Sequence, residues 1–297
     1  MQLSGNSINL VCDDYNATIV TMGGAVASLR YMGHHIIMPF KPDVIPAGHM
    51  GKVLAPWPDR LVDGRYLFEN KYYQVPVDDI ENMTANHGLV AWKEWHISSI
   101  SPTALVLKTY VSPIYGYPFL IDLSVNYEVI NGMGLKVDIT ATNIGKIDAP
   151  YGVGMHPYLT CEGETIDTCR LTMPYKEVYT LNERKIADRL VPVDDLGFNF
   201  TSERVIGDTQ MDHTFASPDA THMNTVLLEN RDLKVYCKTN APYMQIFTPP
   251  FLNRKCLAVA PMSCPSNAFN NGTGLIVLKP RQYHTLTYII GALKQVV

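Results

Sequence analysis

The most regular pattern in this chain of 297 residues is the run Ile121-Asp122-Leu123-Ser124-Val125-Asn126-Tyr127-Glu128-Val129. Apolar and polar side chains alternate in it, which is the period of a β-strand with one face buried and the other in water. Asn131-Gly132 follows as a turn signal, and the same alternation resumes over residues 135–142. The two halves therefore predict a β-hairpin.

Shorter extended stretches flanked by Gly, Pro, Asn or Asp occur on both sides of this hairpin. They are residues 7–12, 17–22, 104–111, 226–228, 233–238, 244–248 and 275–278. No long segment has the period of an amphipathic helix, and no low-complexity linker or strong repeat divides the chain. Because all-β sandwiches and barrels often reach this length as one unit, the sequence predicts an all-β chain with a single domain over residues 1–297.

The composition suits a globular protein with a large core, since 46% of the residues are hydrophobic and 18% are charged. The formal net charge is −4, without a dense basic run, so we expect no nucleic-acid partner. No apolar stretch approaches the roughly 20 residues that cross a bilayer, and the first residues lack a signal-peptide pattern. These features predict a cytoplasmic protein without a membrane partner.

Motifs of several common enzyme classes are absent from the sequence. There is no nucleophile elbow of serine hydrolases, no P-loop, no dinucleotide-binding glycine motif and no zinc-protease helix motif. The six cysteines are scattered without the paired spacing of a zinc site. Serine hydrolases, nucleotide-dependent enzymes and zinc proteases therefore lose support.

Four segments set histidine, arginine or aromatic side chains beside glycine and proline. Polar groups in such aromatic surroundings are typical of a sugar site, where ring faces stack on C–H surfaces and polar groups bind hydroxyls. Arg60 follows a stiff Pro-Trp-Pro turn, and His87 and His156 each adjoin Gly or Pro. Taken alone, each is more often a structural turn histidine or a surface arginine. The segments are residues 51–66, 86–95, 152–158 and 256–275.

Together these segments resemble the aldose 1-epimerase (mutarotase) family, and residues 51–66 are similar to a branch with a Leu-Ala-Pro-Trp-Pro-Asn-Arg block. Further similar segments are residues 116–119, 149–152, 211–215 and 245–250, so the likeness runs from about residue 5 to about residue 290. The resemblance implies a large antiparallel β-sandwich of the galactose mutarotase type. It also implies an open cleft for a free monosaccharide or related sugar, without a metal or organic cofactor, in a monomer or homodimer.

The family's reaction interconverts the α and β anomers of a free aldose. A base removes the proton of the anomeric hydroxyl while an acid protonates the ring oxygen; the ring opens, the C1–C2 bond rotates, and closure gives the other anomer. The resemblance makes His156 the acid, a role that suits a side chain titrating near neutral pH, and makes His87 a second catalytic histidine. It places further sugar contacts at Arg60, Asp212, Gln245 and Trp57, although packing explains Trp57 equally well.

Ala260 departs from the family pattern. A glutamate that serves as the base precedes the family's Pro-Met pair, whereas Ala260 precedes Pro261-Met262, and no Asp or Glu follows Asp232. We therefore expect the base to be missing from this position. The sequence leaves open an isomerase weakened by this loss or a sugar-binding or sensing homologue without turnover. It also leaves open whether the alanine is native or was introduced to trap a sugar.

Asp59 is a smaller departure, because this branch of the family has asparagine before the arginine. We expect Asp59 to pair with Arg60. A third interpretation is a relative of hexose-6-phosphate epimerases, which needs a basic cluster for the phosphate. The sequence offers only Arg60 with Lys52 or Arg65 for that cluster.

Overall fold

The predicted hairpin lies at the centre of a large sheet. The computed structural model describes residues 2–162, 165–216 and 222–295. In it β12 (Ile121–Ile130) pairs antiparallel with β13 (Gly134–Asn143), with Val125 opposite Ile139. Buried and half-buried side chains alternate along β12, as the sequence pattern predicted. The seven shorter stretches also fall on strands, so the all-β prediction is confirmed.

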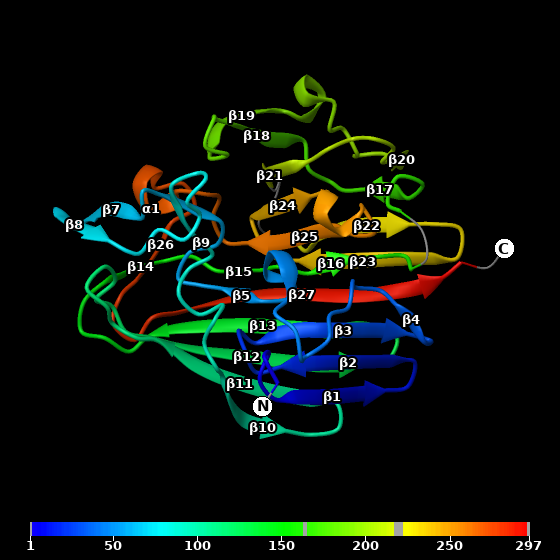
Figure 1. The fold of residues 1–297 in the computed structure, drawn as a ribbon, viewed down its shortest axis with the longest axis horizontal. Helices are drawn as coiled ribbons and strands as arrows, with labels where there is room; N and C mark the ends of the chain where they lie inside the picture. The colour runs from blue at the N-terminus through cyan, green and yellow to red at the C-terminus, as the bar shows by residue number, and fades with distance from the viewer. Residues whose placement is uncertain (1, 163–164, 217–221, 296–297) are drawn as a thin grey trace.

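Nine strands form the sheet that contains this hairpin. In Figure 1 the red strand β27 runs across the middle of the molecule, beside β13. The order across the sheet is β10 (His96–Ile100), β11 (Ala104–Val111), β12, β13, β27 (Tyr283–Lys294), β23 (Leu233–Thr239), β22 (Asn224–Glu229), β17 (Arg170–Thr172) and β20 (Arg204–Val205).

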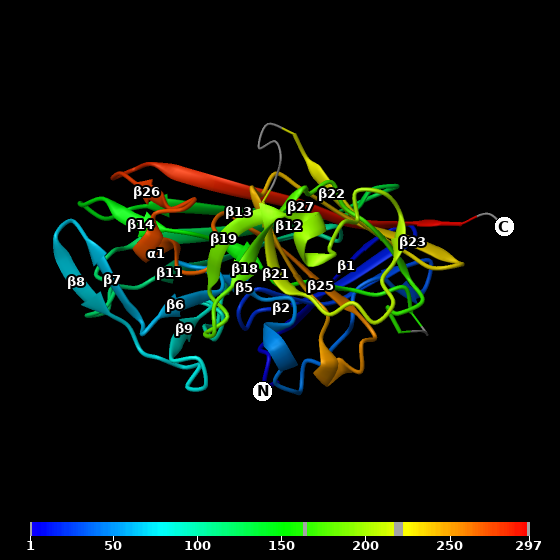
Figure 2. The ribbon, with the colours of Figure 1, turned by 90° about the horizontal axis from the view of Figure 1, so that it is seen from above.

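Two further sheets form a second layer over the nine-stranded sheet, and Figure 2 shows the layers from above. One has four strands, in the order β1 (Ser7–Cys12), β2 (Tyr15–Val20), β3 (Ala25–Tyr31) and β4 (His34–His35). The other runs β19 (Ala187–Pro192), β18 (Glu177–Leu181), β21 (Asp212–Ala216), β24 (Tyr243–Phe247), β25 (Leu257–Met262), β15 (Gly154–Met155) and β5 (Val53–Leu54), with β16 (Tyr158–Leu159) also paired to β25. A continuous hydrophobic core fills the space between the layers. The architecture is an antiparallel β-sandwich.

Short elements complete the fold. Three strand pairs stand apart from the large sheets: β6 (Arg60–Val62) with β9 (Thr84–Asn86), β7 (Arg65–Phe68) with β8 (Lys71–Gln74), and β14 (Ala149–Tyr151) with β26 (Ile276–Leu278). The helical turns are η1 (Ala47–His49), η2 (Val193–Leu196), η3 (Pro250–Leu252) and α1 (Ala268–Asn271). Across the described ranges, none of the helices is long and apolar enough to cross a membrane.

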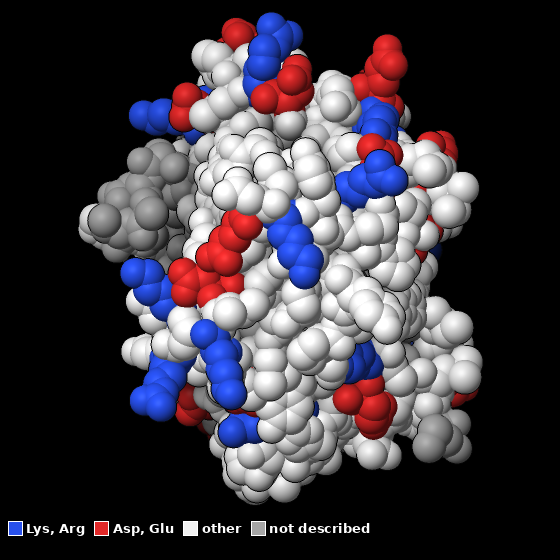
Figure 3. Space-filling model, turned by 90° about the vertical axis from the view of Figure 1, so that its left-hand side faces the viewer, with Lys and Arg blue, Asp and Glu red and all other residues white. Residues whose placement is uncertain are grey.

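Charged side chains of both signs are interspersed on the face shown in Figure 3. Lys and Arg lie beside Asp and Glu there, and no continuous basic area covers that face. This distribution agrees with the small net charge of −4.

Candidate functional site

A cleft of about 330 Å³ opens over the middle strands of the eight-stranded sheet. Its walls come from distant parts of the sequence, because β5, β15, β25, β24 and β21 are neighbours in that sheet. The turns η1 and η3 close it from the side. The lining residues are Gly48, His49, Leu54, Asp59, Arg60, Asn86, His87, His156, Tyr158, Lys185, Asp212, Gln245, Phe247, Pro250, Phe251, Ala260 and Met262.

The period of the strands decides which side chains face the cleft. Gln245 on β24 lies directly opposite Ala260 on β25, and every second residue of a strand points to the same face. Gln245 is fixed at both ends of its amide, since Nε2 donates to Asp212 Oδ1 at 2.9 Å and Oε1 accepts from Thr214 at 2.6 Å. This orientation leaves Asp212 a hydrogen-bond acceptor held in place at the cleft wall.

Arg60 lies between two carboxylates. Its Nη1 is 3.1 Å from Asp59 Oδ1 and its Nε is 3.5 Å from Asp79 Oδ2, so the expected pairing with Asp59 is confirmed. Burial raises the pKa of Asp59 to about 6, although Arg60 opposes this shift; the nearby Asp212 and Asp79 charges add to it. A guanidinium anchored in this way presents its remaining N–H groups in a fixed direction.

His87 is locked to Asp59 through the backbone. The N–H of Asp59 donates to His87 Nδ1 at 3.1 Å, and the N–H of His87 donates to the carbonyl of Asp59 at 2.9 Å. Because Nδ1 accepts, the neutral ring carries its proton on Nε2. Burial lowers the pKa of His87 well below its ordinary value, with His49, His156 and Arg60 contributing. His87 is therefore a neutral hydrogen-bond donor at pH 7.

Gly88 keeps His87 in this position. Its φ is +75°, and a Cβ there would lie 2.2 Å from the carbonyl oxygen of Ala55. Only glycine fits both the left-handed backbone and this close approach. The Asn86-His87-Gly88 turn seen in the sequence thus has a structural reason.

His156 lies beside His87, with 5.4 Å between the ring centroids, and stacks on Tyr158 at 4.9 Å. Its Nδ1 is buried without a hydrogen-bond partner among the described residues. Burial, assisted by His49 and Arg60, lowers the pKa of His156 to about 3. The expectation that His156 titrates near neutral pH is therefore wrong, because burial dominates and no carboxylate of the described residues contacts the ring.

His49 is a cleft residue that the sequence analysis did not single out. Its ring meets His87 edge to face at 4.6 Å and Trp92 at 5.3 Å. Burial, with the charge of Lys52, lowers the pKa of His49 to about 4. No motif marks this histidine, because it reaches the cleft only where η1 brings it against His87 and Trp92.

The structure does not bring every candidate residue to the cleft. Trp57 is buried away from it, donating Nε1–H to the carbonyl of Ala85 at 3.2 Å and packing edge to face on Phe269. Lys52 is also buried elsewhere; its Nζ bonds the carbonyl of Ala91 at 2.6 Å and lies 3.6 Å from the centre of the Trp92 ring. Arg65 bonds Gln74 outside the cleft, so the cluster needed for a phosphate does not form.

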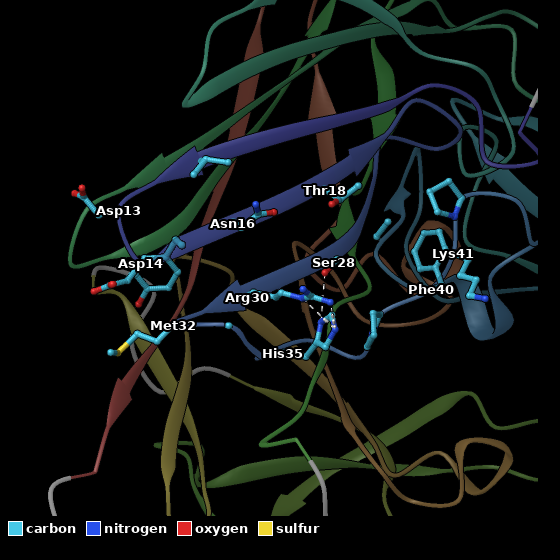
Figure 4. A pocket seen from close by; sticks show the side chains of 16 residues that line it. Asp13, Asp14, Asn16, Thr18, Ser28, Arg30, Met32, His35, Phe40 and Lys41 are labelled. Atoms are coloured by element: carbon cyan, nitrogen blue, oxygen red, sulfur yellow. Dashed lines mark hydrogen bonds between the residues drawn. The ribbon is translucent and has the colours of Figure 1, made fainter.

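A larger hollow of about 880 Å³ lies over the four-stranded sheet, and Figure 4 shows it from close by. Its polar side chains are spread over the turn between β1 and β2 and along β2, β3 and β4. In Figure 4 the dashed hydrogen bonds join Arg30 and Ser28 to His35. The smaller cleft, by contrast, gathers buried histidines, an arginine and two aspartates, which makes it the better candidate site.

The aldose 1-epimerase family model matches residues 7–291. The chain belongs to the aldose 1-epimerase family. A curated relative, the uncharacterized protein YihR of Escherichia coli, is 39% identical over 290 residues, which are 98% of this chain and 94% of that protein.

Solved structures share the epimerase fold at lower identity. The GalM/aldose epimerase homologue from Caenorhabditis elegans superposes with a TM-score of 0.87 at 17% identity, covering 97% of this chain and 99% of its own. Galactose 1-epimerase from Lactobacillus acidophilus superposes with a TM-score of 0.83 at 18% identity, covering 97% of this chain and 94% of its own. At these identities the likeness shows the aldose 1-epimerase fold alone.

Proposed function

We propose that the cleft binds a free hexose-like aldose and interconverts its α and β anomers. The observation that carries this proposal is the convergence of His87, His156, Arg60 and Asp212 in one cavity of about 330 Å³. A cavity of this size suits a monosaccharide. Fixed donors and acceptors on its wall suit hydroxyl groups.

The roles follow from the hydrogen-bonding capacity of each side chain. Arg60 can only donate, and the His87 tautomer presents Nε2–H, so both suit the sugar's oxygen lone pairs. Asp212 accepts, and its Gln245 partner keeps it aimed. His156 serves as the acid at the ring oxygen, in its imidazolium form.

The acid role has a cost at neutral pH. With a pKa of about 3, only a small fraction of His156 is protonated at pH 7. A carboxylate close to the ring would favour the imidazolium. An ionised base near His156 would therefore also raise the fraction of His156 that is protonated. The rate of catalysis thus depends on the base twice, as proton acceptor and as a charge that favours the acid form of His156.

Ala260 is the reason to keep a second candidate function. It is buried in the cleft wall opposite Gln245, and its methyl group cannot exchange a proton. A cleft that lacks a base altogether would be a sugar-binding or sensing site. Such a protein would bind the aldose without changing the rate at which its anomers interconvert.

Binding and turnover are tested separately. Calorimetric titration with common free hexoses and pentoses should give dissociation constants in about the micromolar to millimolar range, and the Asp212→Ala variant should bind more weakly. The optical rotation of a freshly dissolved single anomer of the bound aldose should then relax faster with protein than without it. Absence of binding heat for every aldose would refute the proposed function, whereas binding without acceleration would favour the sugar-binding protein.

A further inference from the structure

We propose that Asp59 is the general base of the cleft, taking the proton of the anomeric hydroxyl that Ala260 cannot accept. The inference rests on the proposed function, because it names the proton acceptor for that reaction. No comparison with known proteins assigns this role to Asp59. Among the described residues that line the cleft, the carboxylates are Asp59 and Asp212, and the case for Asp59 depends on position and on what each carboxylate already binds.

Asp59 follows a residue that packs beside the C-terminal part of β25, the strand that carries Ala260. The residue before it, Pro58, packs on Gly154, where a built Cβ would be 3.1 Å from Pro58 Cβ and 3.1 Å from Met262 Cγ. Gly154 is paired with Met262, two positions after Ala260 on the strand. The segment containing Asp59 therefore reaches the cleft from the side of β15, and Asp59 and Ala260 line the same cavity.

Asp212 is placed less well for this step. It belongs to β21, and β24 separates it from β25. Neighbouring strands are about 4.8 Å apart, so two strand spacings place its backbone roughly 10 Å from that of Ala260. Its Oδ1 also accepts the hydrogen bond from Gln245. These contacts suit a sugar-binding acceptor.

Asp59 lines the cleft and is bound there by its neighbour alone. Oδ1 accepts from Arg60 Nη1 at 3.1 Å, and the backbone N–H of Arg60 also donates to the carboxylate, while no other side-chain donor among the described residues contacts it. The residue has a φ of 57°, a left-handed conformation that is unfavourable for most side chains but tolerated by Asp and Asn. Burial of the carboxylate raises its pKa to about 6, against the opposing effect of Arg60, which brings it near the range that suits a general base.

Asp59 and His156 move the two protons of the proposed reaction. The carboxylate of Asp59 takes the proton from O1, the C1–O5 bond breaks as the C1=O1 bond forms, and O5 takes a proton from the imidazolium of His156. The open aldehyde then rotates about C1–C2. Closure reverses each transfer: O5 attacks C1 from the other face, its proton returns to His156, and Asp59 returns a proton to O1. No oxidant, reductant or further reactant is needed.

The central experiment compares anomer exchange in four proteins: the native chain, Asp59→Asn, Asp59→Asn combined with Ala260→Glu, and the control Asp63→Asn. Asp59→Asn should lower kcat by about 10² to 10³-fold, the worth of a positioned base, while the dissociation constant changes by less than about threefold. The kcat of the double variant should be at least about tenfold higher than that of Asp59→Asn, because its glutamate supplies a carboxylate from β25. Asp63 also has a positive φ, of 53°, but pairs with Arg184 outside the cleft, so Asp63→Asn should keep the native rate.

Thermal melts show whether each variant is folded before its rate is compared. If Asp59→Asn is folded and keeps the native rate, Asp59 is not the base, although the proposed function stands. If the native chain binds sugar without turnover and the double variant, Asp59→Asn with Ala260→Glu, turns it over, the native chain lacks a base and the proposal for Asp59 is overturned. Failure of all four proteins to bind any aldose would instead refute the proposed function.

Discussion

Asp59 combines burial, a left-handed backbone and a carboxylate, and this combination should cost the fold stability. Its pKa is about 6 in the folded chain and 3.8 ordinarily, so the folded state binds this proton more tightly than the unfolded state. The resulting stabilisation is complete below about pH 3.8 and is lost as the pH rises through about 6. From that difference in pKa we expect a loss on the order of 3 kcal/mol.

Asparagine at position 59 cannot ionise, so the free energy of unfolding of Asp59→Asn should not contain this pH-dependent loss. The advantage of Asp59→Asn over the native chain in free energy of unfolding should therefore grow from pH 4 to pH 8, by up to about 3 kcal/mol. Denaturant unfolding at the two pH values measures it, with Asp63→Asn as the exposed control. An advantage that does not change with pH would contradict the raised pKa of Asp59.

The pKa values of Asp59 and His156 predict the pH dependence of catalysis. In the reacting form His156 is protonated and Asp59 is ionised, so the two residues together carry one titratable proton. With pKa values of about 6 and about 3, the pair loses this proton above about pH 6 and takes a second one below about pH 3. The charged or titratable described groups that face the pair are Arg60, Asp79, Asp212, His49, His87, Tyr158 and Cys264.

Consequently kcat/KM should be level between about pH 3 and 6 and fall about tenfold per unit above pH 6. Initial rates of mutarotation across pH 4 to 8, corrected for the uncatalysed reaction, measure this profile. A value of kcat/KM that instead rises through pH 6 to a plateau would show that His156 acts without an added proton.

At the residue scale, the sequence identified most of the cleft through resemblance. His87, His156, Arg60, Asp212, Gln245 and Ala260 all line the same cavity. Trp57 does not, because aromatic residues in a Pro-rich turn serve core packing as readily as ligand contact. His49 was not recognised, since only the packing of distant segments brings it to the other histidines. The shifted pKa of His156 also depends on burial, which a local motif does not encode.

At the element scale, strand alternation on β21, β24 and β25 builds the binding wall. Gln245→Leu keeps the approximate volume but removes the donor to Asp212, leaving that carboxylate free to turn. We expect sugar affinity to fall about tenfold, the size of one hydrogen bond to a charged group. Gln74→Leu, on the exposed strand β8, should leave affinity unchanged in the same calorimetric titration. Equal affinities for the native chain and Gln245→Leu would show that Asp212 needs no such support.

Strands with one solvent-exposed face were predictable from the sequence, and strands buried on both faces were not. The alternation of residues 121–129 and 135–142 locates β12 and β13 to within a residue or two. By contrast, all six residues of β25 are buried and one is Pro261, so neither alternation nor propensity marks it. β27, with 12 residues, was missed because Gly291 and a run of buried residues interrupt its pattern.

At the scale of the whole molecule, stability and sugar binding should be separable. Ile290 lies fully buried in β27, paired with Leu135 and Cys237 at the middle of the nine-stranded sheet. Ile290→Ala should lower the free energy of unfolding by about 2 to 5 kcal/mol through lost contacts and a cavity. Denaturant titration measures the loss. The folded variant should bind sugar as the native chain does, and a selective loss of binding would mean that the sheet controls the cleft directly.

The central claim is that this cleft interconverts sugar anomers. The most direct test is exchange NMR on an equilibrium mixture of the bound aldose, which measures the rate of α to β conversion without any net reaction. We predict that the native chain raises the exchange rate in proportion to protein concentration and that His156→Ala abolishes the increase while still binding the sugar. An exchange rate equal to that of the protein-free solution, at concentrations where calorimetry shows the sugar bound, would contradict the claim.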